Sequence, residues 1–214
     1  RGNEVLILAV DEAGLLGAMC DTIVGAGGYP LAWYGRPLPD AEQSVAVVAS
    51  AGEATGYLDQ ISVSWGDNEL GQGPTGVCMR TLSTQVRNNL ASAAGYSPWR
   101  QAAHASGLEC SISLPVLVDG ELDGALMVYA SEPHAFDHQA ESLLTDLAAD
   151  LGFGLFRLRE AVALREARAD AATRRQQLQA TLDAQPDPFI LLGAMRDEQG
   201  EITGLVVEEA NQAA

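Results

Sequence analysis

Apolar residues recur along the chain with two different periods, and these periods predict its helices and strands. Between Asp11 and the pair Gly27-Gly28 they fall three or four positions apart, which predicts an amphipathic helix. Asp11 is a good cap for its start, and the glycine pair ends it. The residues on the apolar face of this helix are Leu15, Leu16, Met19 and Ile23.

Three stretches after this helix have the patterns of strands. Residues 29–37 are rich in aromatic side chains, and residues 61–65 alternate between apolar and polar positions. Residues 44–52 are apolar almost throughout. An apolar run without alternation is typical of a strand covered on both faces, so residues 44–52 are predicted to lie in the middle of the sheet.

Two short helices and a hairpin complete the first domain. Residues 75–82 and 97–107 predict the helices, and residues 84–90 between them predict a further strand. Residues 110–131 predict two alternating strands that turn near Asp119-Gly120. This order predicts an α+β domain, with a central antiparallel sheet of about six strands and helices on both faces.

A long C-terminal helix is predicted from about Asp137. Leucines fall three or four apart from there to Leu158, and no proline occurs before Pro186. The later part of the helix has many charges and few apolar positions, so alone it would be weakly stable. Pairing with a second copy would give a short coiled coil, and we expect a homodimer rather than a solvated monomeric helix.

The last stretch of the chain returns to a globular pattern. Two strands around a turn at Asp197–Gly200 are predicted, followed by a helix that begins at Asn211. So few residues cannot bury a core, so we expect them to open a second domain that the sequence does not complete. The predicted organisation is a domain over residues 1–155, a helical linker over residues 156–182 and a domain fragment over residues 183–214.

Charge and hydropathy exclude several classes of partner. The net charge is −17, and all twelve basic residues are arginine. Nucleic acids and anionic membranes need a cationic surface, so neither is an expected partner. No apolar run approaches the roughly 20 residues that span a bilayer. The run "EVLILAV" at residues 4–10 is too short and lacks the flanks of a signal peptide, which predicts a cytoplasmic protein.

Three segments in the same order along the chain resemble a GAF domain of bacterial multidomain signalling proteins. They are "DEAGLLGAMCDTIVGAGGYPLAWYG", "AGEATGYLDQISVSWGDNELGQGPTG" and "CSISLPVLVDGELDGALMVYASEPHAFD". The resemblance covers about residues 5–160. The tail "LDAQPDPFILLGAMRDEQGEITGLVVEEANQAA" looks like the opening of a PAS domain, with Asn211 where that family starts its first helix.

The resemblance implies a sensory module. GAF domains bind small molecules between the sheet and its short helices and transmit the result along the terminal helix. The order GAF, helix, PAS implies a covalently linked output domain, in most cases a diguanylate cyclase with or without a phosphodiesterase domain. A sensor histidine kinase and a PP2C-type phosphatase are the alternative outputs. The sequence lacks the catalytic motifs of all these output domains, so no catalytic residue is predicted.

The glycine-rich stretch "NELGQGPTGVCMRT" at residues 68–81 has two interpretations. A Walker loop is excluded because it needs a lysine, and the chain has none. A dinucleotide-binding loop is excluded because the next strands are antiparallel. Gly71, Gly73 and Gly76 permit a tight turn, and Thr75 can cap the following helix. The helix start either offers free amide groups to an anion or only completes a compact turn.

A ligand site is predicted beside this loop. Trp33 or Tyr34 can reach it, because consecutive strand residues point to opposite faces. Ser111 and Ser113 share a strand face, which either lines a polar cavity or faces water. Arg87 and Arg100 could each form a salt bridge with an acidic side chain instead of binding a ligand. The candidate ligand-binding residues are Trp33, Trp65, Gly73, Thr75, Gly76, Arg87, Asn88, Trp99, Arg100, Ser111 and Ser113. Aromatic faces, amides and a few arginines favour a purine nucleotide, namely GTP, cyclic GMP or cyclic AMP.

Other chemistries are less well supported by the sequence. The three cysteines are far apart and odd in number, so neither a disulfide framework nor a metal site is predicted. No cysteine precedes a histidine, which argues against a bilin, and a haem ligand would have to be His104, His134 or His138. Cys78 and Cys110 flank the expected cavity and could pair, as in GAF proteins that reduce free methionine sulfoxide. A dimerisation module without a ligand is the remaining alternative.

Overall fold

A computed structural model describes residues 11–184, 187–197, 199–211 and 213. Contacts between residues divide the chain into a unit that ends at Arg159 and a unit that begins at Glu160. The first unit holds the predicted α+β domain, and the second holds the end of the long helix and a hairpin.

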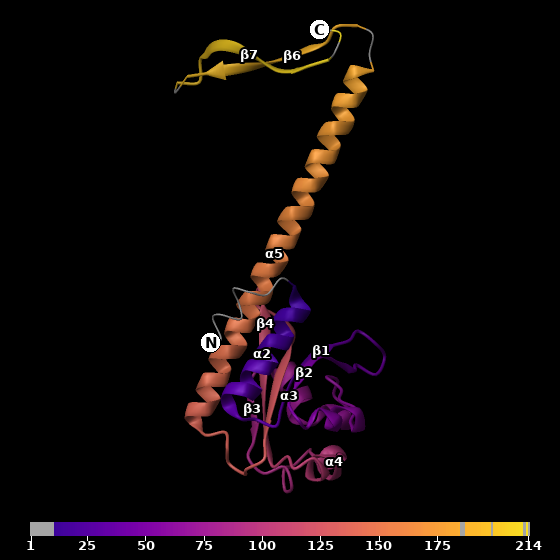
Figure 1. Cartoon of the computed structure of the whole chain (residues 1–214), viewed down its shortest axis with the longest axis vertical. Coiled ribbons are helices and arrows are strands. Elements are labelled where there is room, and N and C mark those ends of the chain that lie inside the picture. Colours follow the sequence, from indigo (N-terminus) through magenta and orange to yellow (C-terminus); the bar gives the residue numbers. More distant parts are fainter. Residues whose placement is uncertain (1–10, 185–186, 198, 212, 214) are drawn as a thin grey trace. The chain divides into compact units, whose positions relative to one another are not determined.

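A sheet forms the centre of the first unit (Figure 1). It is antiparallel and has five strands, in the order β2-β1-β5-β4-β3. Its central strand, β5, pairs with β1 on one side and with β4 on the other. Asp119 and Gly120 both have positive φ values (53° and 82°), which suits the tight turn between β4 and β5. The strands are β1 (Leu31–Pro37), β2 (Val45–Ala51), β3 (Gln85–Arg87), β4 (Cys110–Val118) and β5 (Glu121–Ala130).

Two long helices cover one face of this sheet. The helix α2 (Glu12–Gly27) begins at Asp11, whose carboxylate accepts a hydrogen bond from the Gly14 amide, and it ends at Gly28. The helix α5 (His138–Asp183) spans 46 residues, and its part up to Arg159 belongs to the first unit. Leucines of both helices pack against alternate residues of β4 and β5 to form the helix-face core. The amphipathic patterns of both helices are therefore confirmed.

Short helices and loops cover the other face. They comprise the 3-10 helices η1 (Thr55–Gln60), η2 (Glu69–Gly71) and η3 (Ser97–Trp99) and the α-helices α3 (Pro74–Thr81) and α4 (Arg100–Ala105). Aromatic side chains dominate the core on this side, which we call the loop-face core. Because consecutive strand residues point to opposite faces, each central strand contributes to both cores. Trp33 lies in the loop-face core and Tyr34 in the helix-face core.

Two strand predictions are wrong in detail. Residues 44–52 form β2, which lies at the edge of the sheet rather than in its middle, and Val47 and Val48 are 47% and 39% exposed. Residues 61–65 form only an isolated bridge between Ser44 and Ser64. Their alternation has another cause, because Ile61 and Val63 pack against the loop-face core. The sheet therefore has five strands among the described residues, not six.

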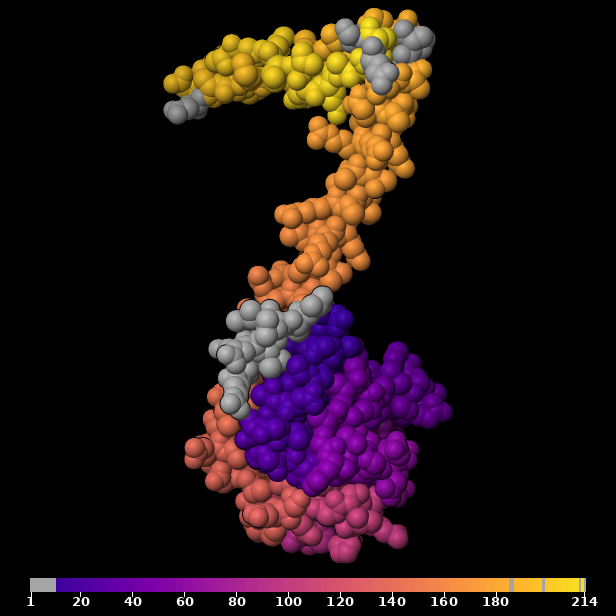
Figure 2. Space-filling view, viewed as in Figure 1, coloured from indigo at the N-terminus to yellow at the C-terminus, as the bar shows by residue number. Residues whose placement is uncertain are grey.

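The second unit contains the end of α5 and a two-stranded antiparallel sheet of β6 (Ile190–Arg196) and β7 (Ile202–Ala210). This confirms the two predicted strands. Residues 160–178 of α5 are exposed, and Figure 2 shows their side chains standing out from the helix. The helix expected from Asn211 falls on residues 212–214, of which 212 and 214 lie outside the described part of the chain. Asn211 itself is buried and accepts a hydrogen bond from the Phe189 amide.

Candidate functional site

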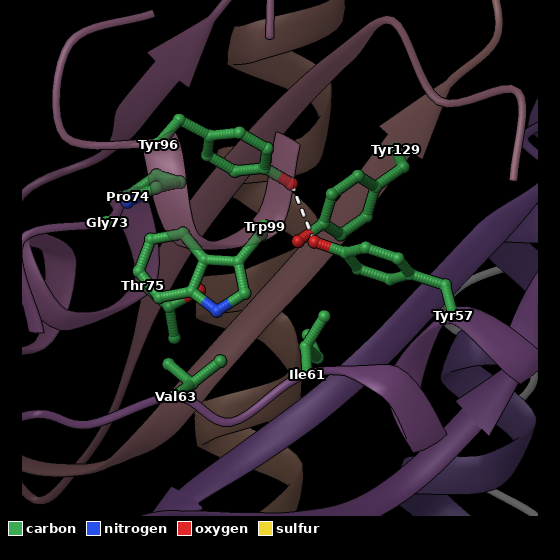
Figure 3. Close-up of a pocket in the computed structure, with 9 residues that line it drawn as sticks. All are labelled: Tyr57, Ile61, Val63, Gly73, Pro74, Thr75, Tyr96, Trp99 and Tyr129. Atoms are coloured by element: carbon green, nitrogen blue, oxygen red, sulfur yellow. Dashed lines mark hydrogen bonds between the residues drawn. The ribbon is translucent and has the colours of Figure 1, made fainter. Parts of the chain in front are cut away.

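A small cavity lies between the sheet and the start of α3 (Figure 3). Its volume is about 10 Å³, which is room for roughly one water molecule. Pockets for small ligands usually measure about 300–1,000 Å³, so the side chains hold this one nearly closed. The residues that line this tyrosine cavity are Tyr57, Ile61, Val63, Gly73, Pro74, Thr75, Tyr96, Trp99 and Tyr129.

Three buried tyrosines from separate elements meet at one end of the tyrosine cavity. The hydroxyls of Tyr57 and Tyr96 are 2.7 Å apart and share a hydrogen bond, and Tyr129 lies beside them (Figure 3). The Tyr57 and Tyr129 rings meet edge to face, with centroids 5.4 Å apart. Burial raises the pKa of all three hydroxyls. They therefore stay neutral at physiological pH and can donate and accept hydrogen bonds, but they cannot serve as bases.

Trp99 forms the opposite wall of the cavity and fits against a glycine. Its indole N–H donates to the Ser62 carbonyl over 2.8 Å, and its ring contacts that of Tyr96. A side chain at Gly73 would overlap with the Trp99 ring. Gly73, not Thr75, is the N-cap residue of α3, so the predicted cap is wrong. Thr75 is instead buried in the cavity wall, at the second position of the helix.

The other glycines of the loop allow backbone segments to pack against each other. A Cβ at Gly71 would overlap with the Gly66 carbonyl, and a Cβ at Gly76 would overlap with the Gly71 carbonyl. Arg80 fastens this arrangement, because its Nη1 donates to the carbonyls of Trp65, Gly66 and Gly71 over 3.1, 2.6 and 2.9 Å. The stretch is thus a compact turn held by the guanidinium of Arg80. Nη1 of this nearest arginine is already used in hydrogen bonds to the turn.

Two polar groups on the loop-facing side of the sheet lack a hydrogen-bond partner among the described residues. They are the hydroxyls of Ser111 and Ser113, both buried. Ser111 pairs across the sheet with Tyr129, and Ser113 pairs with Met127, so both serines face the loop-face core rather than water. Buried polar groups without partners are rare in folded proteins, so these two hydroxyls are available to a polar molecule if the site opens.

Of the predicted ligand-binding residues, only Gly73, Thr75 and Trp99 line the tyrosine cavity. Trp65 is half-buried and donates its indole N–H to the Leu38 carbonyl, and Arg87 donates to the Val86 carbonyl. Gly76 lies behind the cavity wall, within the turn described above. Asn88 donates to the Phe136 carbonyl over 3.4 Å, which ties β3 to the segment before α5.

Arg100 lies at a separate hollow. It is exposed and borders a cavity of about 510 Å³ on the outer side of α4. No arginine lines the tyrosine cavity among the residues that the structure describes. Within the same part of the chain, neither Arg87 nor Arg100 forms an ion pair. The salt-bridge alternative for these two arginines stays a prediction.

The three tyrosines that define the cavity are not among the residues predicted from the sequence. Tyr129 could have been predicted from the sequence. Side chains along residues 121–130 alternate between the two faces of the sheet, and Tyr129 falls on the face toward the cavity. Tyr57 and Tyr96 lie in irregular segments, where no period indicates which way a side chain points. Neither could have been placed from the sequence.

A family profile described as a GAF domain matches residues 9–155 of the chain. The chain belongs to the GAF domain family. The profile covers the whole first sheet and the start of α5, which confirms the resemblance to GAF domains and the α+β fold. The tail lies outside the matched residues, so its likeness to a PAS domain stays a prediction. A search of curated proteins gives no match.

Solved structures share this GAF fold at low sequence identity. The free methionine-R-sulfoxide reductase of Neisseria meningitidis is 17% identical, with a TM-score of 0.60 over 75% of this chain and 87% of that one. The GAF domain of an Acinetobacter phosphoenolpyruvate-protein phosphotransferase is 18% identical, with a TM-score of 0.58 over 78% and 93%. The bacteriophytochrome RpBphP3 of R. palustris is 14% identical, with a TM-score of 0.62 over 87% and 41%.

Cys78 and Cys110 of this GAF domain lie on opposite sides of the sheet. Cys78 lies in the loop-face core and Cys110 in the helix-face core, so the sheet separates them. The expectation that these two could pair across the cavity is therefore wrong. Burial raises the pKa of the Cys78 thiol to about 12, and it also raises the pKa of Cys110. A thiol that stays protonated is a poor nucleophile.

Two further observations bear on the partners of the chain. None of the described helices is long and apolar enough to cross a membrane. Within the same residues, no group of three or more histidine, cysteine and acidic side chains is placed to hold a metal ion.

Proposed function

We propose that this GAF domain is the sensory part of a signalling protein and that its ligand enters the tyrosine cavity. One observation carries the proposal. Three buried hydroxyls converge on a cavity whose other wall is Trp99, and the buried hydroxyls of Ser111 and Ser113 lie on the same side of the sheet without partners among the described residues. A cavity used only for packing would be filled by apolar side chains, because buried polar groups cost free energy unless they are paired. The closed cavity is then the ligand-free state.

Purine nucleotides remain our lead ligands, with GTP, cyclic GMP and cyclic AMP as the candidates. The aromatic walls offer faces on which a base could stack, and the tyrosine hydroxyls could bond its polar edge. The absence of arginine from the described lining suggests that the base, rather than the phosphates, is enclosed. The tyrosines would have to separate to admit it, since the cavity now has a volume of only about 10 Å³.

Thermal unfolding in the presence of nucleotides and nucleosides tests this proposal. A ligand at about one hundred times its dissociation constant adds roughly 2.7 kcal/mol to stability. For a chain of this size, that raises the midpoint by roughly 5–10 °C. We expect such a shift with one nucleotide and with its nucleoside, because the base carries the recognition. Tyr57→Phe should reduce the shift, whereas Arg100→Gln should leave it unchanged.

Failure of every purine compound to raise the midpoint would reject the nucleotide proposal. The alternative would then be a dimerisation module whose pocket is permanently filled by its own side chains. A shift that Arg100→Gln abolishes would keep a nucleotide ligand but move its site to the outer hollow beside α4.

We also propose that the chain relays its signal to an output domain through a PAS domain. The support is the β6-β7 hairpin, which exposes large apolar side chains on both faces and cannot bury a core alone. These exposed side chains are Phe189, Ile190, Leu191, Leu192, Met195, Ile202, Leu205, Val206 and Val207. Cyclic di-GMP synthesis or degradation is our lead output, with a histidine kinase or a phosphatase as the alternatives.

The exposed part of α5 is proposed to pair with a second copy of the chain. Leu164 and Leu178 are each 52% exposed, and two heptads separate them, so they share one stripe of the helix. The double variant Leu164→Glu with Leu178→Glu is expected to convert a dimer into a monomer in sedimentation equilibrium. Thr173→Glu is the matched control, since Thr173 lies on the opposite side of the helix. A dimer that survives the double variant would contradict this interface.

A further inference from the structure

A network of charged and polar side chains lies where α5 leaves the GAF domain. Arg159 is the last residue of the first unit, and its guanidinium contacts two carboxylates. It donates to both oxygens of Glu12, over 2.7 and 3.2 Å, and to Oδ1 of Asp123 over 2.6 Å. These contacts join α5 to the start of α2 and to the central strand β5.

Asp123 is the centre of this network. Its side chain is 7% exposed and also accepts hydrogen bonds from the Tyr34 hydroxyl (2.5 Å) and from Nη2 of Arg36 (2.9 Å). Burial opposes its ionisation, but the hydrogen bonds from Tyr34, Arg159 and Arg36 outweigh burial and lower its pKa. The buried carboxylate is therefore charged, and it takes donors from β1 and α5 at once. We call Glu12, Tyr34, Arg36, Asp123 and Arg159 the helix-exit network.

The helix-exit network is connected through the sheet to the loop-face core. Trp33 and Tyr34 are consecutive residues of β1 that point to opposite faces, one toward the loop-face core and one toward the network. Gly124, the residue after Asp123, leaves the space that this contact needs. A Cβ there would lie 2.6 Å from the Tyr34 hydroxyl and 2.5 Å from the Gly35 carbonyl. Trp33 and two donors of Asp123, Tyr34 and Arg36, thus lie on the same strand.

We propose that Asp123 is the positioning residue that couples the state of the sheet to the place of α5. Opening of the tyrosine cavity displaces β1, draws Tyr34 and Arg36 away from Asp123 and so changes how the carboxylate holds Arg159. Coupling of this kind needs two arrangements with different contacts, and a buried carboxylate shared by two elements supplies them. The inference extends the proposed sensory function, but it does not depend on which ligand binds.

The test measures the position of α5 in the whole chain by electron paramagnetic resonance. Spin labels at Glu69→Cys and Arg165→Cys, both exposed sites, report the distance between the domain and the helix beyond it. The native cysteines are buried and remain unlabelled. Dilution with unlabelled protein removes distances between copies. We expect Asp123→Asn to shift or broaden the distance distribution, because the amide keeps the shape but loses the charge that holds Arg159.

Glu121→Gln is the matched control, since it removes an exposed carboxylate from the same strand and should leave the distribution unchanged. If Asp123→Asn does not fold, Tyr34→Phe removes one donor, keeps the ion pairs and should produce a smaller shift of the same sign. A lowered unfolding midpoint with an unchanged distribution would overturn the proposal and leave Asp123 as a stabilising residue only.

A second variant tests the link to the loop-face core. Trp33→Phe changes β1 on the side away from the helix-exit network, and we expect it to shift the distribution in the same direction as Asp123→Asn. Trp65→Phe, at a half-buried residue outside the cavity, should not. An unchanged distribution in Trp33→Phe would overturn the coupling through β1. Neither readout uses a ligand, so a negative nucleotide screen would not affect it.

Discussion

Gly76→Ala is expected to lower the free energy of unfolding by about 2–3 kcal/mol. The new Cβ would overlap with the Gly71 carbonyl oxygen and lie 2.5 Å from the Ser64 carbonyl oxygen and 2.8 Å from the Gly71 Cα. All three contacts are with backbone, which cannot rotate away as a side chain can. Alanine is better than glycine in a helix by about 1 kcal/mol, so the overlap must exceed that gain for the variant to be destabilised.

Gly25→Ala supplies the opposite expectation in the same protein. Gly25 lies in α2, and an added Cβ meets nothing within 4 Å. The substitution should therefore raise stability by about 0.5–1 kcal/mol, through the lower entropy of the unfolded chain. Urea unfolding followed by circular dichroism measures both variants. Equal effects of the same sign would show that the turn at Gly76 can relax and that its close packing is not required.

The elements with strong periodicity could be predicted from the sequence. The helix after Asp11 and the long helix from residue 138 repeat their apolar residues every three or four positions over many turns, and both exist. The hairpin over residues 110–131 has clear alternation and a turn signal at Asp119-Gly120, and it also exists. In each case the local signal and the tertiary environment agree, so local reasoning was sufficient.

The wrong strand predictions have a shared physical origin. An apolar run such as residues 44–52 shows that a strand avoids water, but it does not show how many neighbours the strand has. This strand contacts β1 and the helix α2, and its residues Val47 and Val48 remain exposed. Residues 61–65 alternate because every second side chain enters a core, and that requirement is the same with or without a neighbouring strand. Pairing is a property of the whole fold, which one segment cannot specify.

The candidate site was only partly within reach of the sequence. Gly73, Thr75 and Trp99 line the cavity, as predicted. They could be predicted because each lies in the glycine-rich stretch or near the start of a predicted helix. Tyr57 and Tyr96 reach the same place from irregular segments whose course depends on tertiary packing. The prediction that Cys78 and Cys110 flank the cavity failed for a related reason. Both are close to site residues in the sequence, but they lie on opposite sides of the sheet. Deciding which face each residue occupies required the register of β4.

Trp99→Ala is expected to cost about 3–5 kcal/mol of stability and to open the tyrosine cavity. Trp99 is 4% exposed, packs against Gly73 and Tyr96, and donates its indole N–H to the Ser62 carbonyl. Its removal deletes the wall opposite the tyrosine hydroxyls and leaves a hollow of the shape of an indole ring. Native stabilities of about 5–15 kcal/mol leave the variant folded at low temperature, where urea unfolding can measure the loss.

Indole should restore part of that loss, because it can fill the space that the side chain occupied. At about ten times its dissociation constant it would add about 1.4 kcal/mol to the variant, and it should add little to the wild type, whose cavity has room for roughly one water molecule. Trp65→Ala is the control, since Trp65 is half-buried outside the cavity and should show no response to indole. A response to indole confined to Trp99→Ala would mean that the pocket can hold a planar ring once its wall moves, as a purine base requires. The absence of any response would mean that the surrounding residues collapse into the space, which would favour a closed structural core over a sensor.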